Sequence, residues 1–228
     1  MEKDLAAVIS KHRRWLDRMG LKDKPWLILG SAPDPTIPVG ITSTHLRIDI
    51  NNVGRTATAL GLGRASLTIR ARRKSWEEHQ ELDTQALLWI HEYPTPLLKA
   101  LLALKPHKFV GSIGRISRRN RDALVAEIAS TRLENIGELN KVTNGVAAVC
   151  YGLAIGVPRI VLAGISLSKN GHSYDQLERK RRQVDEDAYV LHRLSSHPAL
   201  YTTEADLAMQ TGLPLVRGPD TPTSGRNP

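Results

Sequence analysis

Residues 139–174 read LNKVTNGVAAVCYGLAIGVPRIVLAGISLSKNGHSY, and this stretch decides the fold of the chain. A polar turn at 143–145 opens an apolar segment, 146–155, whose small residues allow a helix to approach a sheet closely. Residues 156–158, Gly-Val-Pro, end that helix. The next run, 159–164, is short, apolar and rich in branched residues, which is typical of a strand buried on both faces of a parallel sheet. The stretch therefore predicts an α/β fold.

Two parts of this stretch are candidate edges of a binding site. In open α/β sheets, ligands bind outside the carboxyl ends of the strands. The polar loop 165–174 follows the buried strand directly, and the turn 143–145 begins the preceding helix. We therefore expect ligand contacts from the helix start and from the loop.

The composition fits one large α/β domain with a basic surface. The chain has 228 residues, of which 41% are hydrophobic and 4% aromatic, so aliphatic side chains can fill its core. Its single cysteine, Cys150, lies in the apolar helix and predicts a buried thiol, and no Cys/His group has zinc-ligand spacing. The net charge of +9 favours anionic partners, and nucleic acid, anionic lipid headgroups and sugar nucleotides all qualify.

Residues 1–20 predict an amphipathic helix. Apolar residues between Leu5 and Met19 form one broad stripe, and the basic residues between Lys11 and Arg18 lie mostly off it. One interpretation is a helix packed on the domain, and the other is a basic face that rests on the acidic surface of the inner membrane. The chain has no run of about 18 apolar residues. The segment also lacks the apolar core of a signal peptide, so we expect a cytoplasmic protein.

The remaining segments predict the other strands and helices of a single domain. Apolar runs of strand length occur at 26–30, 65–69, 86–90 and 213–216, and apolar residues alternate with polar ones at 45–50, which also predicts a strand. Helices are expected at 55–62, 95–104, 122–133, 176–194 and 202–210. Residues 111–121 are basic and punctuated by glycine, which we interpret as a mobile loop or lid. The predicted division is a helix at 1–20, a Rossmann-like domain at 21–217 and a flexible tail at 218–228.

Polar or basic residues follow three of the predicted strands. The turn at 30–33, Gly-Ser-Ala-Pro, lets backbone amides face a phosphate with little steric hindrance. Asn51 and Asn52 can hydrogen-bond a base or a ribose, or they only make a turn. The cations at 70–74 can form an anion-binding rim, or they belong to a solvated basic loop.

The order of these pieces resembles a known family of enzymes. A first strand ends in a Gly-x-x-Pro turn, a second strand ends in Asn, and Thr-x-Gly-Val opens an apolar helix. A strand ending Ala-Gly-Ile and the loop Asn-Gly-x-Ser-Tyr follow. This order is similar to the CMP-sialic-acid-dependent bacterial sialyltransferases of glycosyltransferase family 42 and their relatives. The resemblance covers roughly residues 26–216 and is strongest over 143–174.

The resemblance implies both a fold and an activity. The implied fold is a single Rossmann-like domain of the GT-A-variant type, with a mainly parallel central sheet flanked by helices. The implied activity is transfer of an acidic sugar, sialic acid or a Kdo-like sugar, from a CMP-activated donor to a hydroxyl of a surface glycan or glycolipid. Neither a metal nor a cofactor is expected, and nucleic acid is not an expected partner. Homo-oligomerisation is left open.

The resemblance also assigns roles to individual residues. The residues expected to bind the donor nucleotide are Gly30, Ser31, Pro33, Asn51, Thr143, Asn144 and Gly145. Those expected to contact the leaving phosphate are Ser168 and Tyr174, and those expected to contact the acidic sugar are Arg70 and Arg115. The expected catalytic residues are Tyr174 and His197, a general base for which His192 is the alternative. The family has Asn, Asp and Tyr where this chain has Ser31, Ser166 and Ser168.

Two other functions compete with this interpretation. A protein of the same fold that binds a nucleotide or a partner without catalysis, or with weak catalysis, would account for the departures at Ser31 and Ser168. A nucleic-acid-binding protein could use the basic segments 70–74 and 115–121. The scarcity of aromatic residues counts against stacking on single strands, and no helix-turn-helix or zinc pattern supports duplex recognition.

Overall fold

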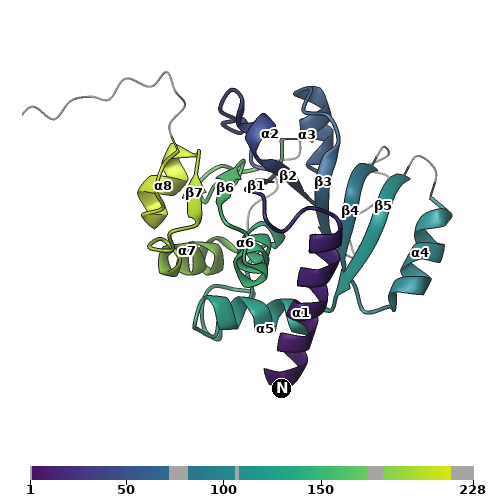
Figure 1. Cartoon of the computed structure of the whole chain (residues 1–228). Helices are drawn as coiled ribbons and strands as arrows, with labels where there is room; N and C mark the ends of the chain where they lie inside the picture. Colours follow the sequence, from purple (N-terminus) through teal and green to yellow (C-terminus); the bar gives the residue numbers. More distant parts are fainter. Residues whose placement is uncertain (1, 72–81, 106–107, 174–181, 217–228) are drawn as a thin grey trace, which may run out of the picture.

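The computed structural model describes residues 2–71, 82–105, 108–173 and 182–216, and the fold is built on a single seven-stranded sheet (Figure 1). The strands are β1 Trp26–Leu29, β2 Leu46–Ile50, β3 Ala65–Ala71, β4 Leu82–Ile90, β5 Lys108–Ile116, β6 Ile160–Ala163 and β7 Leu200–Thr202. Their order is β5-β4-β3-β2-β1-β6-β7, and every neighbouring pair is parallel. The predicted α/β class with a parallel central sheet is confirmed.

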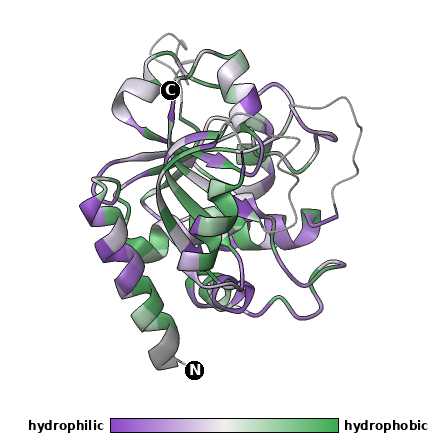
Figure 2. Ribbon diagram, turned by 90° about the vertical axis from the view of Figure 1, so that its right-hand side faces the viewer, coloured by the Kyte–Doolittle hydropathy of each residue, from purple (hydrophilic) through white to green (hydrophobic). Residues whose placement is uncertain are grey.

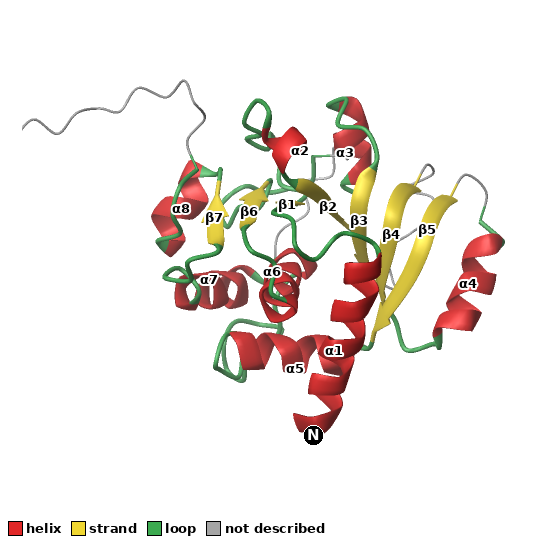
Figure 3. Cartoon of the chain, in the orientation of Figure 1, coloured by secondary structure: helices red, strands yellow, loops and turns green. Residues whose placement is uncertain are grey.

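Helices cover both faces of the sheet (Figure 3). They are α1 Glu2–Arg18, α2 Ile41–Thr44, α3 Gly54–Ala59, α4 Thr95–Ala103, α5 Arg118–Ile128, α6 Asn144–Ile155, α7 Val184–Arg193 and α8 Ala205–Thr211. On one face, α1, α5, α6, α7 and α8 pack in the main core with alternate strand residues such as Ile28 and Ile48. On the other face, Leu27 and Leu29 pack with α2 and α3, while Leu87 packs with α4. The central strands β1 and β6 are apolar on both faces because both faces are covered, and Figure 2 shows the sheet mainly in the hydrophobic colour. Strand β2 differs, since it carries a buried ion pair of 2.8 Å between Arg47 and Asp49.

Helix α6 occupies the centre of the main core. Its sequence has little polarity because nearly all of its residues, from Gly145 to Ile155, are buried. Gly152 is required by close packing, since a Cβ there would lie 2.7 Å from Cδ1 of Ile160 on β6. Gly156 ends the helix in the left-handed conformation with φ 89°. Cys150 is fully buried, as predicted, and burial raises the pKa of its thiol to about 12.

The segment 111–121 was expected to be a lid, and this prediction is wrong. Its first part belongs to strand β5 at the edge of the sheet, and its last part begins helix α5, which Ser117 caps. The glycines serve close packing. A Cβ at Gly111 would lie 2.6 Å from the carbonyl oxygen of Gln85, and one at Gly114 would lie 2.5 Å from the ring of Trp15.

The carboxyl-terminal part of the domain differs from the prediction in one strand. The last strand is β7, whereas the expected strand at 213–216 contributes an isolated bridge between Leu215 and Thr202. Helix α8 is confirmed, with Gly212 at its end. Helix α7 begins at Val184, and residues 176–181 of the helix predicted there lie outside the described residues.

The amino-terminal helix packs on the domain. Leu5 and Leu16 of α1 belong to the main core, and buried His12 makes a 2.8 Å hydrogen bond between its Nδ1 and the hydroxyl of Tyr151. Within the described ranges, no helix is long and apolar enough to cross a membrane. The division at residues 20 and 217 stays a prediction, and the predicted tail at 218–228 lies outside the described residues.

Candidate functional site

A cavity of about 420 Å³ opens at the carboxyl ends of β1, β2 and β6. The strand order reverses between β1 and β6, and such a switch point is where open parallel sheets bind ligands. The structure brings most of the predicted nucleotide-binding residues together in its lining, namely Gly30, Ser31, Asn51, Thr143, Asn144 and Gly145. The remaining one, Pro33, is not among the lining residues.

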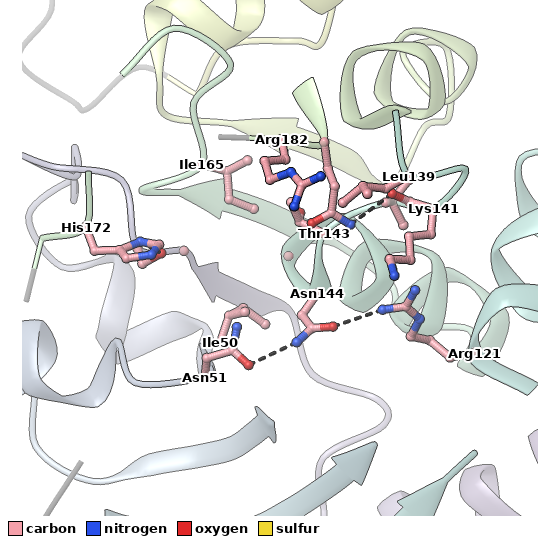
Figure 4. Close-up of a pocket in the computed structure, with 15 residues that line it drawn as sticks. Ile50, Asn51, Arg121, Leu139, Lys141, Thr143, Asn144, Ile165, His172 and Arg182 are labelled. Carbon is pink, nitrogen blue, oxygen red and sulfur yellow. Dashed lines mark hydrogen bonds between the residues drawn. The ribbon is translucent and has the colours of Figure 1, made fainter. Parts of the chain in front are cut away.

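Two asparagines and an arginine form a hydrogen-bonded relay across the cavity (Figure 4). Arg121 Nη1 donates to Oδ1 of Asn144 at 3.1 Å, and Nδ2 of Asn144 donates to Oδ1 of Asn51 at 3.0 Å. The same Asn51 oxygen accepts from the backbone nitrogen of Ala71 at 3.2 Å. The relay therefore fixes the amide of Asn51 with its oxygen engaged, so the amide nitrogen is the group that it can offer to a ligand.

Three cations line the cavity, and two of them are paired with carboxylates outside its lining, Arg121 with Asp122 and Arg182 with Glu138. Arg121, Lys141 and Arg182 line it, and no acidic side chain is among the described residues of the lining. The helix α6 also begins here, and the amino end of a helix favours anions. Sequence reasoning missed these three residues. It placed Arg121 in a lid and Arg182 within the predicted helix 176–194, and nothing local in the sequence relates them to the switch point.

The first turn of α7 holds one wall of the cavity in place. Asp187 accepts from the backbone nitrogen and from the hydroxyl of Thr143, both at 2.7 Å. Its neighbour Glu186, also buried, accepts from the backbone nitrogen of Leu139 at 2.7 Å. Gln183 donates to the carbonyl oxygen of Lys141 at 2.9 Å. The segment 139–143 is thus anchored to α7 by side chains on one helical turn.

The turn after β1 is built by close backbone packing. A Cβ at Gly30 would collide with the carbonyl oxygen of Gly164 and would lie 2.6 Å from Cγ1 of Ile165, so glycine is required where β1 and β6 end. The next residue, Ser31, forms a 2.9 Å hydrogen bond between its Oγ and Nδ1 of His172, which also lines the cavity. His172 belongs to the loop 165–174, from which ligand contacts were expected, although no role in the site was assigned to this residue.

The expected contacts to a leaving phosphate are only partly located. Ser168 does not line the cavity, because its hydroxyl donates to Oδ2 of Asp206 at 2.9 Å and Ser166 donates to the same oxygen at 2.6 Å. Burial raises the pKa of Asp206, but hydrogen bonds from these two serines outweigh it, and the pKa is lowered overall. Tyr174 lies outside the described residues.

The two histidines predicted as the general base lie away from the cavity. His197 precedes β7, and its Nδ1 accepts from the backbone nitrogen of Ala199 at 3.2 Å. Since β7 runs parallel to β6, residues just before it lie at the amino edge of the sheet, opposite the cavity. His192 lies in the last turn of α7, whose first turn faces the cavity, roughly 13 Å away along the helix axis. The structure corrects this prediction, because neither imidazole is placed to act in the cavity.

The two arginines predicted to contact the acidic sugar are used inside the fold. Arg70 is fully buried on β3, and its Nη1 donates to Oδ1 of Asn52. Arg115 on β5 donates to the carbonyl oxygens of His91 at 3.1 Å and of Glu92 at 3.2 Å. Neither arginine lines the cavity. The predicted contact with the acidic sugar is therefore corrected, and both guanidinium groups have structural roles instead.

Comparison with known proteins finds similarity at the level of the fold. No protein-family model matches the chain, and no curated protein matches its sequence. The monofunctional alpha-2,3-sialyltransferase Cst-I from Campylobacter jejuni is similar with a TM-score of 0.54 and 15% identity, over 85% of this chain and 81% of that one. The sialyltransferase CstII from Campylobacter jejuni, in complex with cytidine-5'-monophosphate, is similar with a TM-score of 0.53 and 16% identity, over 85% of each chain. At such identities the likeness shows a shared fold.

Proposed function

We propose that this chain transfers an acidic sugar, sialic acid or a Kdo-like sugar, from a CMP-activated donor to a hydroxyl of a surface glycan or glycolipid. The cavity at the switch point carries this proposal, because it combines fixed amide donors with three cations and a helix amino terminus. Its volume of about 420 Å³ is of the size that binds small ligands. The shared fold with Cst-I and with the CMP complex of CstII supports the choice of donor.

The lining residues divide naturally between the parts of such a donor. The amide nitrogen of Asn51 and the backbone at 143–145 serve the nucleotide. The turn at Gly30 and Ser31, together with the amino end of α6, serves the phosphate. Arg121 and Arg182 replace Arg70 and Arg115 as the partners proposed for the carboxylate of the sugar.

The chemistry explains why a positive cavity is useful. Departure of the sugar leaves an oxocarbenium-like centre and an anionic phosphate, and fixed positive groups stabilise that phosphate most when they are oriented before the reaction. The amino end of α6 and the three cations supply this charge. We therefore propose a metal-independent transfer, in which a divalent cation is not needed to neutralise the phosphate.

Binding of a nucleotide without sugar transfer is the second candidate function. Ser168 is engaged by Asp206, and His197 lies at the opposite edge of the sheet, so two of the predicted catalytic contacts do not reach the cavity. Nucleic-acid binding is less favoured, since Arg70 and Arg115 donate to groups inside the fold.

A thermal-shift titration tests the proposal. The ligands are CMP, UMP, AMP, GMP, CMP-N-acetylneuraminic acid and CMP-Kdo. A ligand that binds only the folded chain raises its stability by about 2.7 kcal/mol at one hundred times its Kd. We expect selective stabilisation by the cytidine compounds. The absence of any shift with them would refute the donor site.

A matched pair of variants on α5 localises the binding. Arg121→Ala removes a cation of the cavity, whereas Arg119→Ala removes an exposed cation from the same helix. We expect the first to weaken CMP binding and the second to leave it unchanged. Release of CMP from the two sugar donors, measured with and without added glycan, then separates transfer from binding alone. CMP binding without release would favour the second candidate function.

A further inference from the structure

Ser31 and His172 form a side-chain pair at the β1 side of the cavity, where Figure 4 shows His172. The Oγ of Ser31 lies 2.9 Å from Nδ1 of His172, and both residues line the cavity. Ser31 belongs to the turn that we assign to the donor phosphate. The imidazole therefore stands at the phosphate end of the proposed site.

Two hydrogen bonds of the next residue, Ser173, hold the backbone beside this histidine in position. The backbone nitrogen of Ser173 donates to the carbonyl oxygen of Ser31 at 2.9 Å. The hydroxyl of Ser173 lies 2.6 Å from the hydroxyl of Thr56 at the start of the neighbouring helix α3. The pair is thus held by the turn after β1 and by α3, and a side chain fixed in this way is oriented before a ligand arrives.

The other described residues that were predicted to transfer a proton or to contact the leaving phosphate do not lie beside Ser31 in the cavity. Ser168 donates to Asp206, and His192 and His197 lie toward the amino edge of the sheet. Within the described part of the chain, His172 is the histidine that lines the cavity. Imidazole changes its charge near neutral pH, so it can give or take a proton there.

We propose that His172 is a catalytic residue that assists departure of the donor phosphate, an inference that rests on the proposed function. In a direct displacement, the acceptor attacks from the face opposite the leaving group. A group paired with Ser31 stands on the leaving side, so it acts on the phosphate and not on the acceptor hydroxyl. His172 thereby takes the role that the sequence suggested for Ser168.

The step balances as follows. The acceptor oxygen forms a new bond to the anomeric carbon with its own electron pair, and the bond from that carbon to the phosphate oxygen breaks. The electron pair of the broken bond goes to the phosphate oxygen, which accepts a proton from the imidazolium of His172. The proton of the acceptor hydroxyl passes to solvent, and the imidazole takes a proton back from solvent before the next turnover.

Steady-state kinetics with CMP-N-acetylneuraminic acid and CMP-Kdo test this role. For His172→Ala we expect kcat to fall about 100-fold or more, which is the usual contribution of a positioned proton donor. CMP affinity should stay within roughly threefold of the original value, since general-acid catalysis acts on the transition state. Added imidazole should restore part of the lost kcat. Ser31→Ala should lower kcat less, because the imidazole remains.

Two further histidine variants make the test decisive. His45→Ala removes an imidazole just before β2, at the amino edge of the sheet, and should leave kcat unchanged. His197→Ala tests the competing assignment. An unchanged kcat in His172→Ala overturns the inference, while the proposed function stands. A fall in kcat in His197→Ala but not in His172→Ala has the same consequence. A loss in His172→Ala that imidazole does not relieve also overturns it. The absence of turnover by the unmodified chain with both donors overturns the proposed function as well.

Discussion

Replacing Asp187 by Ala should destabilise the chain by about 3 kcal/mol, since hydrogen bonds to a charged group contribute roughly 1.5–3 kcal/mol each. The buried carboxylate accepts two bonds of 2.7 Å from Thr143, one from its backbone nitrogen and one from its hydroxyl. Thr143 is only half-buried, so water can replace part of the hydrogen bonding that the substitution removes. The expected destabilisation therefore lies near the lower end of the combined contribution of the two bonds. For a chain of this size, the corresponding fall in Tm is about 6–12 °C.

Asp185→Ala is the matched control for this measurement. Asp185 lies in the same first turn of α7 but is exposed, so both variants lose one favourable charge at the amino end of the helix. That charge contributes about 0.3–1 kcal/mol. Urea unfolding of the two variants gives the contribution of the buried Asp187 carboxylate, which includes its two bonds to Thr143, as the difference between their free energies of unfolding. A difference below about 1 kcal/mol would refute the view that α7 holds the cavity wall through Asp187, given the size of such bonds.

Three further outcomes follow from buried groups. Burial lowers the pKa of His12 to about 4 in the folded chain, whereas the pKa in the unfolded chain is near 6.5. Between these two pH values His12 is protonated in the unfolded chain and neutral in the folded chain. Stability should therefore fall by about 3 kcal/mol as the pH drops through that window, and His12→Gln should flatten the slope seen in urea titrations at several pH values. Cys150 should resist an aromatic disulfide reagent in the native state and react fully in denaturant, because its thiol is buried and its pKa is about 12. Rapid labelling of the native chain would contradict this burial. Gly30→Ala should lower the free energy of unfolding by about 1–3 kcal/mol, the usual cost of overpacking, since the new Cβ meets the backbone of Gly164. An unchanged free energy of unfolding in urea would contradict this close packing.

The elements with strong local signals were predictable from the sequence. Strands β1, β3 and β6 are mainly apolar runs and β2 alternates apolar with polar residues, while α6 carries a capping threonine and a terminal glycine. Because parallel strands end at one edge of the sheet, the residues after β1 and β2 and the start of α6 could be expected to meet. The cavity contains Ser31, Asn51 and Asn144 for this reason.

The errors concern features that depend on distant packing. The glycines of β5 suggested mobility, but they are explained by Gln85 and Trp15, which lie far away in the sequence. Arg121 reaches the cavity because α5 packs beside α6, and no local pattern reveals this. Strand β7 has only three residues and was not recognised, so His197 could not be seen to precede a parallel strand and to lie at the wrong edge.

The strand order also sets the sequence in which the chain can assemble during its synthesis. Strands β1 to β4 each pair with the next strand along the chain, so this part of the sheet can form from neighbouring segments as they leave the ribosome. The pairing of β1 with β6 joins Trp26 to Ile160, and contacts between such distant segments form slowly. The cavity lies across this late junction, and the carboxylates that hold its wall come from α7, which is made later still. Occupancy of the cavity would therefore report that β6 has paired with β1, and a nascent chain that ends before β6 would carry strands β1 to β5 without a complete binding site.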